Sequence, residues 1–149
     1  MCGIAGFVAD PAHRSAADKM RAVAKAMDFS LEHRGPDGHD VWIDDDAGIA
    51  LVHRRLAIVD LSPAGHQPMH SADGRYIISY NGEVYSHLAI RADLEAAGHQ
   101  FRGHSDTEVI LEAVAEYGIA ATASRLIGMF AFAIWDRKDR TLTLVRDRL

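Results

Sequence analysis

The chain has one cysteine and an excess of negative charge, and both features narrow the classes of protein to which it can belong. Cys2 is the only cysteine in 149 residues, which rules out an intrachain disulfide and fits a reducing compartment. The formal net charge of -5 does not favour nucleic acid as a partner. No apolar run approaches the roughly 20 residues of a membrane span, and no signal-peptide pattern is present. We therefore expect a cytoplasmic protein without a membrane partner.

Motifs for metal and nucleotide binding are also missing. His66 and His70 have the spacing of two ligands on a helix, but Pro68 between them excludes a helix there. No His-Glu-x-x-His motif or Cys/His pair occurs, and neither does a phosphate-binding loop or a dinucleotide fingerprint. The sequence therefore predicts no metal site and no cofactor in this segment.

The remaining composition, 48% hydrophobic and 25% charged, is that of one globular domain with a sizeable core. The expected strands come in groups and do not alternate singly with helices, which favours an α+β domain over a doubly wound parallel sheet. Strands are expected over residues 3–9, 41–43, 48–53, 76–80, 130–135 and 141–145, and helices over residues 16–32, 86–98, 105–117 and 121–126.

Short polar signals mark the ends of these elements. Ser15 and Ser105 are each followed three residues later by an acid, which is the pattern of a capping box. Ser86 is expected to cap a further helix. Residues 34–38, 44–46 and 62–74 are expected to form turns and loops.

Cys2 is the residue that most suggests chemistry. Removal of Met1, which is usual before a small side chain, would leave Cys2 with a free α-amine. Such an amine is far less basic than lysine and is partly neutral at pH 7. It can therefore act as the base for the thiol of its own residue. The simpler interpretation is an inert, buried cysteine.

Three other clusters each allow a structural and a functional interpretation. The pair Arg54-Arg55 is either solvated surface, or one of the two arginines binds a small carboxylate with both arms of its guanidinium. Asn81-Gly82 is either a tight hairpin turn or an oxyanion hole made by an amide side chain and a backbone N–H. Asp106 either complements a helix dipole or binds a substrate ammonium group.

Taken in order, these clusters form one pattern. They resemble the glutaminase domain of class II glutamine amidotransferases, specifically its glutamine-hydrolysing asparagine synthetase branch. The sugar-phosphate and purine amidotransferases share the cysteine and the Asn-Gly pair but resemble residues 55–60 less well. The motifs that carry the resemblance are MCGIAGF (1–7), HRGPDG (33–38), HRRLAIVD (53–60), GHQPM (65–69), YNGEVY (80–85), GHSDTE (103–108) and GMFAFA (128–133).

The resemblance implies a role for each matching residue. Cys2 would be the nucleophile, and Arg55 would bind the α-carboxylate of L-glutamine. Asn81 and Gly82 would form the oxyanion hole, whereas Arg54 is given no role. The rest of the pocket would be lined by Glu83, by Asp106 holding the α-ammonium group, and by the backbone of Leu56, Ala57, Ile58 and Val59.

The resemblance also implies a fold and a reaction. The fold would be the four-layered α/β/β/α N-terminal-nucleophile hydrolase sandwich, truncated at its C-terminus because the family continues with further strands. The domain would hydrolyse L-glutamine to glutamate and ammonia through a thioester on Cys2. The ammonia would serve an attached synthetase domain that amidates aspartate. ATP and Mg²⁺ are expected only in that domain, which is absent from residues 1–149.

Three alternatives remain open at this point. The ammonia acceptor could differ from aspartate, or the domain could bind glutamine as a non-catalytic regulator. It could also be a hydrolase of the same fold that acts on another amide. A homodimer is left open as well.

Overall fold

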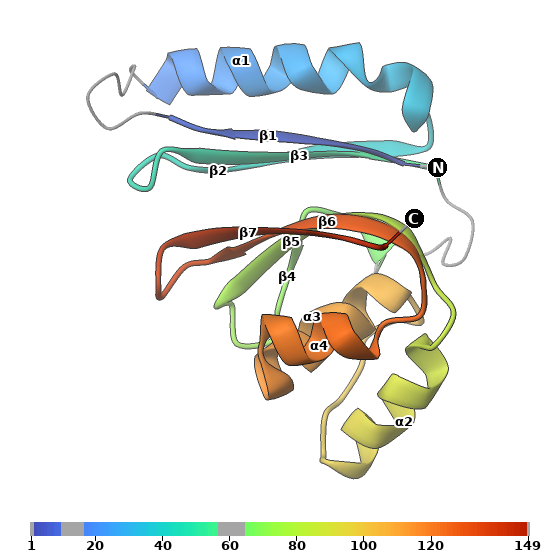
Figure 1. Cartoon of the computed structure of the whole chain (residues 1–149). Helices are drawn as coiled ribbons and strands as arrows, with labels where there is room; N and C mark the ends of the chain where they lie inside the picture. Colours follow the sequence, from blue (N-terminus) through green and yellow to red (C-terminus); the bar gives the residue numbers. More distant parts are fainter. Residues whose placement is uncertain (1, 10–16, 57–64, 149) are drawn as a thin grey trace.

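The computed structural model describes residues 2–9, 17–56 and 65–148. They form two antiparallel sheets stacked face to face between two layers of helix (Figure 1). The first sheet has the order β1-β3-β2, and the second has the order β4-β5-β6-β7. Their strands are β1 (Gly3–Val8), β2 (Gly38–Asp44), β3 (Ile49–Arg55), β4 (Met69–His70), β5 (Tyr76–Val84), β6 (Gly128–Asp136) and β7 (Thr141–Arg146).

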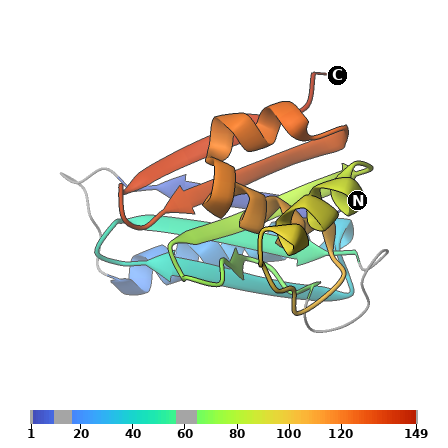
Figure 2. The ribbon, with the colours of Figure 1, turned by 90° about the horizontal axis from the view of Figure 1, so that it is seen from below.

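The helices cover the outer faces of the two sheets. Helix α1 (Ala17–Ser30) lies on the first sheet, followed by a short 3-10 turn, η2 (Glu32–Arg34). The second sheet is covered by α2 (His87–Ala96), α3 (Asp106–Tyr117) and α4 (Ile119–Arg125), which Figure 2 shows from below. This arrangement is an α/β/β/α sandwich, and all its strand pairs are antiparallel. The α+β expectation is therefore confirmed.

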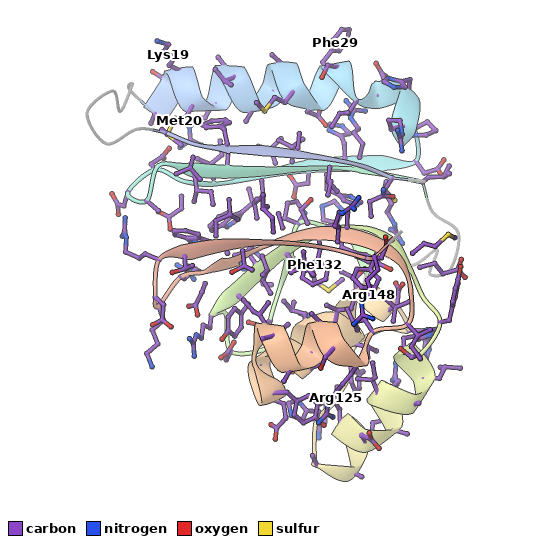
Figure 3. All side chains as sticks on the ribbon, in the orientation of Figure 1. Lys19, Met20, Phe29, Arg125, Phe132 and Arg148 are labelled. Atoms are coloured by element: carbon purple, nitrogen blue, oxygen red, sulfur yellow. The ribbon has the colours of Figure 1, made fainter. Side chains whose placement is uncertain are left out.

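Alternation along the strands supplies three apolar layers. Successive strand residues point to opposite faces of a sheet. On β3, Ala50 and Val52 pack with Ala24 of α1, whereas Leu51 packs between the sheets with Ile77. Helix α1 also has one buried and one exposed side. Met20 points at the sheet, whereas Lys19 and Phe29 point away from it (Figure 3).

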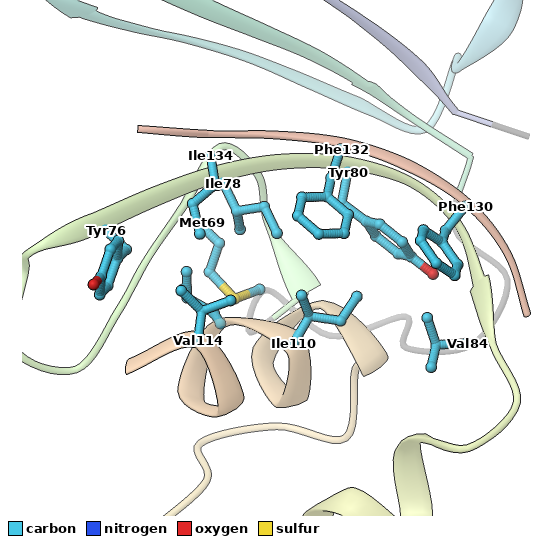
Figure 4. Packing of buried hydrophobic residues seen from close by; sticks show 11 residues of the cluster. Met69, Tyr76, Ile78, Tyr80, Val84, Ile110, Val114, Phe130, Phe132 and Ile134 are labelled. Carbon is cyan, nitrogen blue, oxygen red and sulfur yellow. The ribbon is translucent and has the colours of Figure 1, made fainter. Parts of the chain in front are cut away.

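The third layer, between the second sheet and α3, is the largest hydrophobic cluster. Tyr80 and Phe132 point from the sheet toward Ile110 and Val114 of α3 (Figure 4). Each fully buried side chain of this size contributes about 1.5–3 kcal/mol relative to an exposed one. Burial on α3 therefore fixes the position of β5, the strand that carries the Asn-Gly pair. None of the helices in the described part of the chain is long and apolar enough to cross a membrane.

The hairpin-turn interpretation of Asn81-Gly82 was wrong. Strand β5 continues through both residues to Val84, with Asn81 opposite Ala131 and Gly82 opposite Phe130. The tendency of Asn-Gly to turn is overridden because β6 continues the pairing on this side.

The capping signals were partly correct. Ser105 accepts a hydrogen bond from the Glu108 N–H at 3.3 Å and so caps α3 as expected. Ser86 makes no capping bond to α2, because its hydroxyl bonds the Arg125 carbonyl and the Ile127 N–H instead. The Ser15 signal lies outside the described residues.

Element boundaries differ slightly from the expected ones. Helix α1 ends at Ser30 rather than at residue 32, and α4 begins at Ile119 rather than at residue 121. The expected loop 62–74 contains the short strand β4 (Met69–His70) within its described part.

Candidate active site

Cys2 lies where β1 begins and β3 ends. The antiparallel register places Gly3 opposite Arg54, so Cys2 lies next to the last residues of β3. The Leu56 N–H donates a hydrogen bond to Cys2 Sγ at 3.3 Å, and Sγ lies 3.7 Å from the Leu56 carbonyl oxygen. The cysteine is half-buried and has no disulfide partner. Two backbone groups of one residue therefore fix the position of the sulfur.

Arg55 belongs to the face of β3 that looks toward the second sheet. His53 is on this face, because its Nε2 lies 3.0 Å from the Tyr80 carbonyl oxygen on β5. Arg55 is two residues further along the strand and so shares that face. It is half-buried, at the same end of the sandwich as Cys2.

Arg54 points the other way, toward α1. Its guanidinium donates to both carboxylate oxygens of Asp28, at 2.6 and 2.8 Å, and to the Asp28 carbonyl oxygen at 3.0 Å. Both side chains are buried, so the surface interpretation of this arginine pair was wrong for Arg54. The cause is the alternation of β3, which directs Arg54 at the one acid that α1 buries.

Asn81 lies on the second sheet, at the end of the sandwich that holds Cys2 and Arg55. Ser79, two residues earlier on β5, donates to the Val52 carbonyl oxygen at 3.0 Å, so this face of β5 looks toward the first sheet. Asn81 and Glu83 follow on the same face. Asn81 is half-buried with its Oδ1 enclosed, whereas Glu83 is exposed. Cys2, Arg55 and Asn81 thus converge at one end of the layer between the sheets.

Gly82 is a position that only glycine can occupy. Its φ is +155°, and a Cβ there would lie 2.3 Å from the Met129 carbonyl oxygen and 2.6 Å from the Phe130 Cα. The residue is exposed. Its backbone is therefore accessible beside Asn81 without a covering side chain.

Asp106 lies on the opposite side of β5, in the first turn of α3. Its Oδ2 accepts hydrogen bonds from the Tyr80 hydroxyl at 2.5 Å and from the Val84 N–H at 3.0 Å. Burial first, and then the charge and hydrogen bond of Asp106, raise the pKa of Tyr80 well above its ordinary value. The negative charge of Glu83 raises it further.

Two residues that sequence reasoning left without a role support this region. The Gln67 side chain accepts the Tyr80 N–H at 2.7 Å and donates to Thr107 Oγ1 at 3.1 Å, so it joins β5 to α3. His53 is fully buried, and burial lowers its pKa to about 4. Gln67 and His53 each stood inside a motif of the resemblance, but no local pattern marked His53 as more than a strand residue.

The predicted pocket is therefore assembled in part. Cys2, Arg55, Leu56, Asn81, Gly82 and Glu83 lie at one end of the sandwich, and Asp106 is joined to β5 through Tyr80 and Val84. Ala57, Ile58 and Val59 lie outside the described residues. A thiol at the head of β1 in an α/β/β/α sandwich defines an N-terminal-nucleophile hydrolase fold.

The comparisons with known proteins give the family. Residues 1–149 match the model of the glutamine amidotransferase domain, and the chain belongs to that family. It is 40% identical over 147 residues to the glutamine-hydrolyzing asparagine synthetase 1 of Bacillus subtilis, covering 99% of this chain and 22% of that protein. It is 37% identical over 154 residues to Amidase chry2 of Gibberella zeae, covering 99% of this chain and 23% of that protein.

A solved structure shows the same fold. The glutamine phosphoribosylpyrophosphate amidotransferase of B. subtilis superimposes with a TM-score of 0.56 and 24% identity, covering 67% of this chain and 23% of that one. The chain thus spans less than a quarter of the length of these relatives. The domain is like the glutamine amidotransferase domain of asparagine synthetases.

Proposed function

We propose that this domain hydrolyses L-glutamine to glutamate and ammonia, with Cys2 as the nucleophile. The observation that carries the proposal is the convergence of Cys2, Arg55 and Asn81, from two sheets, at one end of the sandwich. Membership of the glutamine amidotransferase family supports the choice of glutamine among amides.

The reaction uses the α-amine of Cys2 as its base. After removal of Met1 the amine takes the thiol proton, and the thiolate attacks the side-chain amide carbon of glutamine. The Asn81 amide and the Gly82 N–H hold the oxyanion, each contributing about 3–4 kcal/mol in comparable sites. The C–N bond breaks, and ammonia leaves with the proton from the terminal ammonium. Water then cleaves the thioester, which yields glutamate and restores the thiol.

Recognition of the amino-acid end of the substrate is assigned to two charged residues. Arg55 binds the α-carboxylate, because a guanidinium pairs with both oxygens of a carboxylate. Asp106 binds the α-ammonium through Oδ1, since the hydrogen bonds from Tyr80 and Val84 both fall on Oδ2. Leu56 orients the nucleophile, and Glu83 lies at the exposed rim. We assign the backbone of residues 57–59 to the remaining wall.

The ammonia is proposed to serve an attached synthetase domain that uses ATP and Mg²⁺ to amidate aspartate. Support comes from relatives named asparagine synthetases, of which this chain covers 19–24%. Relatives named amidases, at 37% and 39% identity, favour a second candidate in which the acceptor or the amide differs. The cytoplasmic location and a homodimer stay predictions.

The test is the release of glutamate and ammonia from L-glutamine by the processed protein and by Cys2→Ala. We expect equal amounts of the two products from the wild type and none from the variant, with unchanged thermal unfolding. Retained turnover in Cys2→Ala would contradict the proposal. Glutamine binding without turnover would indicate a regulatory domain, and faster turnover of another amide would indicate a different substrate.

A further inference from the structure

Two polar atoms buried near the candidate site have no hydrogen-bond partner among the described residues. They are Nδ1 of His53 and Oδ1 of Asn81. Buried polar atoms in native proteins are nearly always hydrogen-bonded, to protein or to ordered water. Among the described residues, only two other buried polar side-chain atoms lack a partner, one in Thr122 on α4 and one in Trp135 on β6. The pair at His53 and Asn81 therefore calls for a specific explanation.

The hydrogen bond of His53 fixes its tautomer. Nε2 lies 3.0 Å from the Tyr80 carbonyl oxygen, which can only accept. Nε2 must therefore carry the ring proton and donate it, which leaves Nδ1 with a lone pair. Burial, assisted by the nearby charges of His66 and Arg55, lowers the pKa of His53 to about 4, although the bond to Tyr80 opposes this. The ring is thus neutral at pH 7, and Nδ1 is an acceptor.

The two unpartnered atoms border the same part of the inter-sheet layer. The Tyr80 carbonyl that receives the His53 bond belongs to the peptide group leading into Asn81. The Asn81 side chain lies on the face of β5 that looks toward β3, as does Ser79, which bonds Val52. Both atoms are acceptors and cannot bond each other. A water molecule, with two hydrogens to donate, joins two such acceptors.

We propose that His53 positions Asn81 through a buried water that donates one hydrogen to His53 Nδ1 and the other to Asn81 Oδ1. With Oδ1 held inward, the amide of Asn81 directs its Nδ2–H groups toward the Cys2 side of the layer. A reversed amide would direct Oδ1 at the developing oxyanion and repel it. The proposal rests on the proposed function, in which Asn81 is an oxyanion donor. His53 is a positioning residue and touches no substrate.

The kinetic test compares His53→Phe, Asn81→Ala and the double variant in glutamine hydrolysis. Loss of one oxyanion donor costs about 10²–10³ in kcat, so Asn81→Ala sets the maximum effect. His53→Phe removes the acceptor and is expected to lower kcat about 10–100-fold with little change in KM. The double variant should lose no more than Asn81→Ala alone, because both act through one group. Additive losses would overturn the proposal.

Two matched variants separate positioning from structural support. His53→Gln keeps an N–H for Tyr80 and an acceptor oxygen, so it should restore much of kcat. Ser79→Ala removes another fully buried hydrogen bond between the sheets, from Oγ to the Val52 carbonyl, and should lower stability without lowering kcat. An equal fall in kcat for Ser79→Ala and His53→Phe would overturn the positioning role.

A measurement on the wild type covers the case in which His53→Phe does not fold. The ¹⁵N chemical shifts of the His53 ring should show Nε2 protonated and Nδ1 as a hydrogen-bonded acceptor. A protonated Nδ1 would overturn the proposal. The proposed function fails separately, when the wild type releases no ammonia or when Asn81→Ala leaves kcat unchanged.

Discussion

The Tyr80 hydroxyl donates a 2.5 Å hydrogen bond to Oδ2 of Asp106, beneath the strand that carries Asn81. The Val84 N–H donates to the same oxygen. Asp106 is 7% exposed and Tyr80 is 3% exposed, so water contributes little to holding this carboxylate. The start of α3 is therefore coupled to β5 at the point where the candidate site lies.

Tyr80→Phe should weaken glutamine binding more than catalysis. The variant removes one donor from the buried carboxylate, at a cost of about 1–3 kcal/mol in the free energy of unfolding. Asp106 then turns more freely, so we expect KM to rise several-fold and kcat to change less. Tyr76→Phe, on the same face of β5 but beside Arg75, is the control and should leave KM unchanged. Equal KM values for wild type and Tyr80→Phe would contradict the assignment of Asp106.

Arg54→Met should strongly destabilise the fold. The variant leaves the Asp28 carboxylate buried without its bidentate partner, and breaking such pairs costs about 3–5 kcal/mol. Arg21→Met is the control, because the Arg21–Asp45 pair is 59% and 39% exposed and should contribute no more than about 1 kcal/mol. Denaturant unfolding of both variants measures the difference. Similar small losses would show that His39, whose Nδ1 lies 3.1 Å from Asp28 Oδ2, is a sufficient partner for the carboxylate.

Gly82→Ala should abolish glutamine hydrolysis and lower the free energy of unfolding by at least about 3 kcal/mol. The new Cβ would overlap the Met129 carbonyl oxygen, so β5 must separate from β6 where Asn81 is held. Gly74→Ala is the control, because φ is +71° there and no atom lies within 4 Å of the added Cβ. It should cost only the strain of the left-handed conformation, about 1–2 kcal/mol. A fully active Gly82→Ala would contradict the account.

His99 should contribute pH-dependent stability. Hydrogen bonds to Glu116 and Glu112 raise its pKa above 6.5 in the folded protein. A raised pKa means that this stabilisation is complete below pH 6.5 and is lost as the pH rises through the folded value. The loss of stability in His99→Gln should thus be greater at pH 6 than at pH 9, by less than about 1 kcal/mol. His66→Gln, at the exposed pair with Asp40, is the control. Equal losses for His99→Gln at both pH values would contradict the prediction.

The sequence indicated the fold well where local patterns and tertiary pairing agree. The hairpin of β6 and β7 and the Ser105 cap of α3 follow from alternation and from side-chain chemistry within a few residues. The family resemblance added the layered sandwich, which composition and periodicity alone could not distinguish from other α+β folds.

The errors arose where distant segments decide the outcome. Asn81-Gly82 has the local chemistry of a turn, but β6 lies about 50 residues later and pairs through it. Arg54 is buried because Asp28 of α1 faces it, a partner that no local pattern reveals. His53 opens one motif of the resemblance, but no local pattern revealed its role, since that role depends on a carbonyl of another sheet.

The most direct test of the account is the intact mass of the purified protein before and after exposure to an electrophilic glutamine analogue. We predict loss of Met1 and one covalent adduct located on Cys2, prevented by excess L-glutamine and absent in Cys2→Ala. The Leu56 contacts already place the sulfur at the head of the candidate pocket. A folded chain that has lost Met1 yet forms no adduct on Cys2 would contradict the claim that Cys2 is the glutamine nucleophile.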